Sequence, residues 1–191
     1  KKIVITSAVR TAIGTFGGSL KKMQGQELGS IVVKEAIKKS KLKPNDIDEL
    51  IMGQVLTGAA GQNPARQAAI QAGLPISKTA YVINQVCGSG LRSVAAGYQA
   101  IMSDDSQIVI AGGQESMSNA PHAINFRDRK KLVKSDLVDT MIKDGLWDAF
   151  NGYHMGITAE NVANKWKITR KQQDNFALLS QTKTEKAQKD G

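Results

Sequence analysis

The chain has 191 residues, enough for one large domain or for one domain and part of a second. Hydrophobic residues make up 41% of it and charged residues 23%, a balance typical of globular proteins and not of disordered ones. Its single cysteine, Cys87, excludes an intrachain disulfide and every metal site built from several cysteines.

Basic residues exceed acidic ones, 26 to 17, which gives a formal charge of +9. The densest basic stretch, residues 127–134, contains no aromatic residue for stacking on bases. We therefore favour a solvated loop or helix face, then a cationic rim that attracts a phosphorylated small molecule, and we expect no nucleic-acid partner.

No apolar run approaches the roughly 20 residues that a membrane helix needs. The first residues, Lys1 to Thr6, turn polar quickly and lack the apolar core of a signal peptide. We expect a cytoplasmic protein that does not bind membranes.

Strand and helix patterns alternate along the first part of the chain. Short β-branched runs predict strands, apolar residues at helical spacing predict helices, and Asn63 with Pro64 is a typical helix start that Gly73 would end. The predicted strands cover residues 3–9, 49–52, 80–86 and 107–111, and the predicted helices cover 27–39, 64–72 and 91–103. Such alternation indicates an α/β fold with a mostly parallel sheet covered by helices.

The regular alternation of strand and helix patterns ends near residue 118. Residues 117–157 are loop-like, Thr158 is predicted to cap a helix that runs to Trp166, and residues 169–172 match a capping box before a last helix. We therefore predict one domain over 1–118 and part of an α-rich loop domain over 119–191.

Cys87 falls between a predicted strand and a predicted helix, with Gly88 and Gly90 after it. Such a turn lifts a side chain above the carboxyl edge of the sheet, where open α/β folds bind ligands. The helix start directs unpaired N–H groups and a partial positive charge at the thiol, which favours the thiolate. The same N–H groups could hold an oxyanion, so thioester exchange is the chemistry that this turn suits.

Other interpretations of these residues stay open. Cys87 could be a small buried side chain. The turn also differs from the nucleophile elbow of hydrolases, which has a glycine where this chain has Gln85. His122 is best interpreted as an exposed loop residue, whereas His154 could be a base, a substrate contact or a structural residue. Two histidines without clustered carboxylates argue against a metal site.

Residues 84–91, Asn-Gln-Val-Cys-Gly-Ser-Gly-Leu, closely resemble the thiolases and in particular the biosynthetic acetyl-CoA acetyltransferases. Further segments resemble the same family and follow in the family's order: residues 10–18, 61–67, 111–118 and 153–161.

The resemblance implies a site and a reaction. Cys87 would accept the acyl group, and its backbone N–H would be one donor of an oxyanion hole. Leu146, His154 and Met155 would line the CoA and acyl pocket. The reaction would join two acetyl-CoA into acetoacetyl-CoA and CoA, or reverse this, with no cofactor beyond the CoA thioester itself. Association into a homo-tetramer would use the region of 127–134.

Thiolases are about twice this length, and their second half supplies a second α/β domain, a histidine that activates the nucleophile and a second cysteine as acid and base. Because the chain has one cysteine, we expect an N-terminal half that is inactive by itself, without the C-terminal thiolase domain. Apolar faces on helix 65–72 and on the helix after Cys87 would then be exposed. The alternatives are another condensing enzyme, such as a ketoacyl synthase, and a non-catalytic CoA-binding or interaction module.

Overall fold

The computed structural model describes residues 1–127, 131 and 137–190, and these form two compact units, Lys1–Gly145 and Leu146–Gly191. Each unit is described by itself below. The domain boundary predicted near residue 118 lies within the first of these units and stays a prediction.

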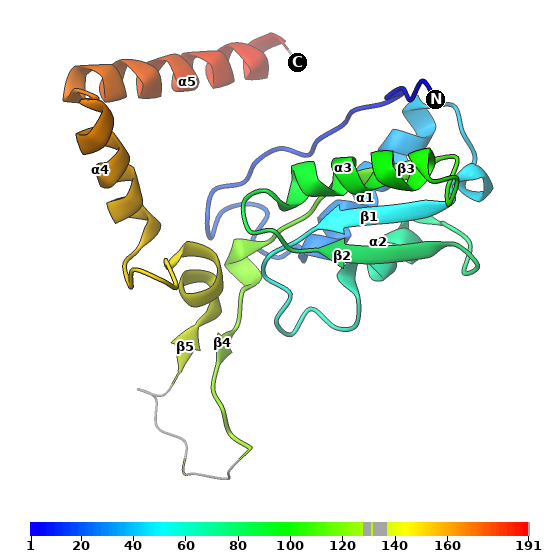
Figure 1. Cartoon of the computed structure of the whole chain (residues 1–191), viewed down its shortest axis with the longest axis horizontal. Coiled ribbons are helices and arrows are strands. Elements are labelled where there is room, and N and C mark those ends of the chain that lie inside the picture. Colours follow the sequence, from blue (N-terminus) through cyan, green and yellow to red (C-terminus); the bar gives the residue numbers. More distant parts are fainter. Residues whose placement is uncertain (128–130, 132–136, 191) are drawn as a thin grey trace. The chain divides into compact units, whose positions relative to one another are not determined.

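A three-stranded parallel sheet forms the centre of the first unit (Figure 1). Strand β1 (Glu49–Gly53) lies between β2 (Thr79–Ile83) and β3 (Val109–Gly113). The register pairs Gly53 with Ile83 on one side and with Gly113 on the other, so the three strands end level with one another. The predicted α/β fold with a parallel sheet is thus confirmed.

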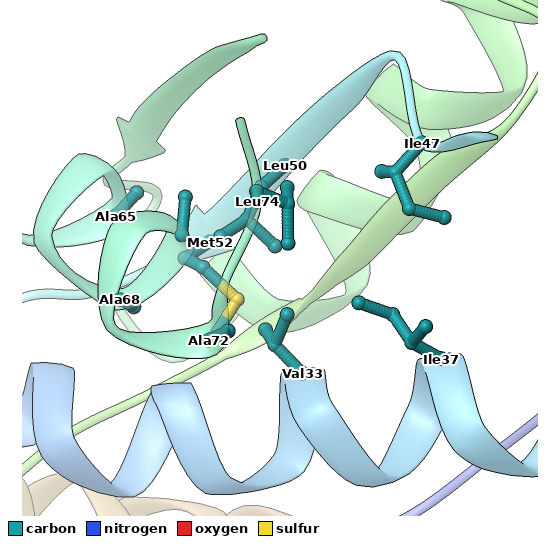
Figure 2. Close-up of a cluster of buried hydrophobic side chains, with 10 residues drawn as sticks. Val33, Ile37, Ile47, Leu50, Met52, Ala65, Ala68, Ala72 and Leu74 are labelled. Carbon is teal, nitrogen blue, oxygen red and sulfur yellow. The ribbon is translucent and has the colours of Figure 1, made fainter. Parts of the chain in front are cut away.

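Helices α1 (Gly25–Lys39) and α2 (Pro64–Ala72) enclose the hydrophobic core on one face of the sheet. In Figure 2, side chains from both helices converge on those of β1. The fully or almost fully buried members of this core include Val33, Ile47, Leu50, Met52, Ala65, Ala68 and Ala69.

Helix α2 begins and ends as the sequence predicts. The side chain of Asn63 accepts a hydrogen bond from the backbone N–H of Arg66, at 3.0 Å, and Gly73 ends the helix with a φ of +93°. The prediction that its alanine face is exposed is wrong, however, because these alanines pack against α1. The two helices approach closely: a Cβ on Gly29 of α1 would lie 3.3 Å from that of Ala68.

Helix α3 (Ser89–Met102) covers the opposite face of the sheet with its smallest side chains. Its buried residues are Ser89, Ser93 and Gly97, spaced four apart and so on one side of the helix. The larger apolar side chains point the other way, and Leu91 is 78% exposed. The predicted exposed apolar face on this helix is therefore present.

The strand predicted over residues 3–9 does not form, and Val4 and Ile5 are exposed. Both edges of β1 are already paired, and the segment pairs with neither free edge of the sheet. It is attached through side chains instead, as where the hydroxyls of Thr6 and Ser40 lie 3.1 Å apart. Strand β2 is also shorter than predicted, since it ends at Ile83 and not near Val86.

The region predicted as loop-like contains several short elements. A single 3-10 turn covers Met117–Asn119, and another, Pro44–Asp46, precedes β1 earlier in the chain. The two-residue strands β4 (His122–Ala123) and β5 (Val138–Asp139) pair antiparallel, and a π-helix follows over Met141–Leu146. Most of the basic stretch 127–134 lies outside the described residues.

The second unit consists mainly of α4 (Met155–Trp166) and α5 (Arg170–Asp190). His154, and not Thr158, caps α4, because the helix starts four residues earlier than predicted. The capping box before α5 is confirmed: Thr169 N–H donates to the side chain of Gln172 at 2.8 Å, and Gln172 N–H donates back at 3.3 Å. Among the described helices, none combines the length and apolar character needed to cross a bilayer.

Candidate active site at the Cys87 turn

The carboxyl ends of the three parallel strands place three loops at one edge of the sheet. The loop after β2 carries Cys87, four residues beyond the end of the strand and two before α3 begins. Cys87 is exposed. The structure therefore offers an accessible thiol at the edge where open α/β sheets bind ligands, immediately before a helix start.

The turn that presents Cys87 holds its neighbour Val86 in a strained conformation. Val86 has a φ of +48°, in the left-handed region that β-branched residues seldom adopt. Two backbone hydrogen bonds close the turn: Gly88 N–H donates to the Gln85 carbonyl at 3.0 Å, and Ser89 N–H donates to that of Val86 at 3.1 Å. Such strain persists only where the surroundings enforce it, and it concentrates at functional sites.

Two side chains hold the strained residue from either side. The Oδ1 atom of Asn84 accepts from the Val86 N–H at 2.9 Å. The buried hydroxyl of Ser89 accepts from the Gln85 N–H at 2.9 Å and donates to the Val86 carbonyl at 2.6 Å. Both peptide groups of Val86 are thus tied to neighbouring side chains.

The first turn of α3 is fixed against the sheet as well. Ser93, which is fully buried, lies one turn beyond Ser89. Its hydroxyl is shared as a donor by two carbonyl oxygens, those of Gly90 at 2.6 Å and Gly112 at 2.7 Å. The latter carbonyl belongs to β3, so this hydroxyl joins the helix start to the end of the strand. These bonds attach α3 to β3 at a point beyond the turn that carries Cys87.

The turn decides which backbone N–H groups could stabilise an oxyanion. Those of Gly88 and Ser89 are used within the turn itself. Among the residues that the structure describes, the N–H groups of Cys87 and Leu91 have no acceptor within hydrogen-bond reach. The N–H of Gly90 also has no acceptor there. The Cys87 N–H is the donor that the resemblance implies, and its role in an oxyanion hole stays a prediction.

Glu115 is a half-buried carboxylate at the same edge that the sequence analysis did not single out. It lies two residues after the end of β3 and accepts hydrogen bonds from the N–H groups of Val55 and Leu56, at 2.8 and 3.2 Å. Burial raises the pKa of Glu115, and the backbone donors partly oppose that shift. The Val55 carbonyl in turn lies 3.5 Å from Nδ2 of Asn84, so the carboxylate is linked to the Cys87 turn.

The other predicted site residues, Leu146, His154 and Met155, belong to the second unit. Nδ1 of His154 accepts from the Gly156 N–H at 3.0 Å, and its backbone pairs with Trp147. His154 therefore has a structural role as the cap of α4, one of its three open interpretations. That these residues join Cys87 in one pocket stays a prediction.

The remaining histidine, His122, is exposed on β4, and its Nε2 lies 3.9 Å from Oδ2 of Asp139 on β5. This fits a surface residue, although in a short strand and not in a loop.

A groove of about 980 Å³ follows β2 and α3 but does not include Cys87. Its lining is mixed and includes Asp48, Lys78, Tyr81, Arg92 and Gln99. Several of these residues lie near the amino ends of the strands, away from the edge that carries the thiol. The candidate site is thus defined by backbone geometry and accessibility at the Cys87 turn, and not by this groove.

Comparison with known proteins agrees with this arrangement. Residues 3–191 match the family described as thiolase, N-terminal domain, and the chain belongs to that family. It is 57% identical to an acetyl-CoA acetyltransferase of Paracoccus denitrificans over 100% of this chain and 49% of that protein. Proteins of the same name from Cupriavidus necator and, as the cytosolic form, from Mus musculus are 58% and 49% identical over 99% of this chain. The chain spans about half the length of these relatives.

Proposed function

We propose that this chain carries the acyl-accepting part of an acetyl-CoA acetyltransferase, with Cys87 as the nucleophile. The observation that carries the proposal is the exposed thiol of Cys87, presented by a strained turn at the start of α3, in a chain that belongs to the thiolase family. Relatives that are 57% and 58% identical bear the name of this activity.

In the first step, the Cys87 thiolate attacks the carbonyl carbon of acetyl-CoA. The negative charge that develops on the carbonyl oxygen is stabilised by backbone N–H groups, of which that of Cys87 is free. The bond to the CoA sulfur then breaks, CoA leaves as the thiol after taking up a proton, and the acetyl group stays on Cys87. Because one thioester replaces another, the acetyl-enzyme is neither strongly favoured nor strongly disfavoured.

In the second step, a second acetyl-CoA must lose a proton from its methyl carbon and attack the acetyl group on Cys87, giving acetoacetyl-CoA and freeing the thiol. This step needs a base beside that carbon. The second cysteine that the resemblance assigns to this task is not among residues 1–191, which contain only Cys87. The acetylation of Cys87 is therefore the half-reaction that we assign to this chain, and the condensation is a property of the whole protein.

Intact-mass measurement after incubation with acetyl-CoA tests this assignment. We expect one acetyl group on the wild-type chain, mapped to Cys87 by peptide analysis, and none on Cys87→Ser. Acetylation elsewhere, or none under conditions in which the folded chain binds CoA, would instead favour a non-catalytic CoA-binding module. CoA binding that is unchanged in Cys87→Ala would point the same way.

Leu146, His154 and Met155 are proposed to line the acyl and CoA pocket of the whole protein, with the size of the pocket suited to an acetyl group. We also propose a cytoplasmic protein that forms a homo-oligomer, a tetramer in the whole protein. The exposed apolar side chains of α3 and the cytosolic mouse relative support this. Analytical ultracentrifugation and cell fractionation are the measurements that test it.

A further inference from the structure

We propose that Ser89 is a positioning residue, whose buried hydroxyl keeps Cys87 in its reactive orientation by locking Val86 in the left-handed conformation. This inference rests on the proposed function, since it concerns how the nucleophile is presented. It goes beyond that function because it assigns a role to a side chain that does not contact the reacting atoms.

The hydrogen bonds of Ser89 are arranged to hold the turn. Its Oγ atom accepts from the N–H of Gln85, on one side of Val86, and donates to the carbonyl of Val86 itself. Together these bonds bridge the backbone of the one residue in the turn with a positive φ, which is +48° at Val86. Breaking them removes the restraint on that side, and the β-branched residue is then free to return to negative φ.

A change of φ at Val86 would move Cys87 directly, because the two residues share a peptide group. The Cys87 N–H, which is free to bind an oxyanion, would turn with that peptide. The thiol would also leave its place immediately before the first turn of α3. Ser89 itself is only 4% exposed, and its hydroxyl already has an acceptor and a donor, so it acts through Val86 and not on the substrate.

Ser93 provides a matched control on the same helix. It is also a buried serine, one turn beyond Ser89, and its hydroxyl likewise lies close to two backbone groups. Those groups are the carbonyls of Gly90 and Gly112, however, and neither belongs to the Val86 turn. Truncation of either serine removes a buried hydroxyl from α3, but only Ser89→Ala releases the strained residue.

The experiment compares the rate of alkylation of Cys87 by iodoacetamide in the wild type, Ser89→Ala and Ser93→Ala, between about pH 6 and 9. Because Cys87 is the only cysteine, the signal has one source. We expect Ser89→Ala to be alkylated about tenfold more slowly than the wild type across this range, because the thiol is no longer held in one orientation. Ser93→Ala should keep the wild-type profile even if it lowers the melting temperature.

A second comparison keeps the test decisive if Ser89→Ala does not fold. In Val86→Gly the backbone adopts positive φ without strain, so the serine has less to restrain. We expect the double variant Val86→Gly with Ser89→Ala to have nearly the same alkylation profile as Val86→Gly alone. The proposal is overturned if Ser89→Ala matches the wild type, if both serine variants lose reactivity equally, or if the loss is the same with Gly at position 86.

Acetyl transfer is measured separately on the wild-type chain. If the alkylation contrast appears and acetyl-CoA leaves no adduct on Cys87, the proposed function fails and the positioning role stands. If the adduct forms and the contrast is missing, the positioning role fails and the proposed function stands.

Discussion

Gly53 and Ser89 lie so close that a Cβ atom on Gly53 would come within 2.5 Å of the Ser89 carbonyl carbon. Gly53 ends the central strand β1, and Ser89 begins α3, so this contact brings the helix that follows Cys87 against the backbone of the sheet. The atoms in the way are backbone atoms, which cannot rotate aside as the end of a flexible side chain can.

Replacing Gly53 with alanine should therefore displace the start of α3. We expect Gly53→Ala to lower the free energy of unfolding by about 1–3 kcal/mol, as overpacking does, and to slow alkylation of Cys87. Chemical denaturation followed by circular dichroism measures the first effect. Gly90→Ala is the matched control, because nothing lies within 4 Å of its Cβ position; that variant should be as stable as the wild type or slightly more so. Equal stability of the two alanine variants would contradict the close contact.

The strain at Val86 predicts an inverted order of stability between glycine and alanine. At most positions glycine is less stable than alanine by about 0.5–1 kcal/mol, because it loses more backbone entropy on folding. At a φ of +48°, alanine keeps the left-handed penalty of about 1–2 kcal/mol and glycine does not. Val86→Gly should thus be more stable than Val86→Ala in thermal denaturation. The ordinary order, with alanine the more stable, would show that the turn is not strained in solution.

Glu115 should make the stability of the chain depend on pH in an unusual direction for an acid. Burial raises its pKa in the folded state, so its contribution is fully present below its ordinary value of 4.5 and declines as the pH rises through the folded value. Glu115→Gln removes the buried charge and keeps one acceptor oxygen for the backbone donors. The free energy of unfolding of Glu115→Gln relative to the wild type should therefore increase between about pH 4 and 7.

A second variant separates the charge of Glu115 from its hydrogen bonds. Glu115→Ala leaves the N–H groups of Val55 and Leu56 without their acceptor and should cost about 1–3 kcal/mol. Urea titrations of the three proteins at both ends of the pH range measure these differences. A difference between Glu115→Gln and the wild type that stays constant with pH would refute the effect of the buried charge.

Asp48 should show the opposite dependence. Its carboxylate accepts from the N–H groups of Gln107 and Ile108, at 2.8 and 3.0 Å, and these backbone hydrogen bonds lower the pKa of Asp48 below its ordinary 3.8. The stability that it contributes is present above that ordinary value and is lost as the pH falls through the folded value. Asp48→Asn should be less stable than the wild type at neutral pH, by about 1 kcal/mol, and the two should converge in acid. Parallel unfolding curves that keep their separation at low pH would contradict this.

Local patterns were enough to predict most of the first unit, because periodicity and capping residues determine where its elements begin. The caps Asn63 and Gly73 are examples, as is the helix start after Cys87. Residues 3–9 have the composition of a buried strand. A strand forms only where the segment pairs with another strand, however, and composition does not report that residues 3–9 pair with neither free edge of the sheet. The exposure predicted for the alanine face of α2 was wrong for a similar reason, since α1 covers it.

At the candidate site, the sequence predicted the position of Cys87 but not the groups that support it. The two glycines after Cys87, Gly88 and Gly90, pointed to a tight backbone, whereas no pattern marks Val86 as the residue with positive φ. Glu115 could have been noticed as a lone acid a few residues after a predicted strand. Its partners, Val55 and Leu56, lie about 60 residues away in sequence, and only the shared edge of the parallel strands brings them together.

A single residue, Val55, joins the loop after β1 to the loop that holds the thiol. The N–H of Val55 is bound by Glu115, and its carbonyl faces the amide of Asn84. A shift of either loop would therefore change the contact between Val55 and Asn84. Residue 55 is accordingly a suitable place for a spectroscopic label that would report occupancy of the site from outside it.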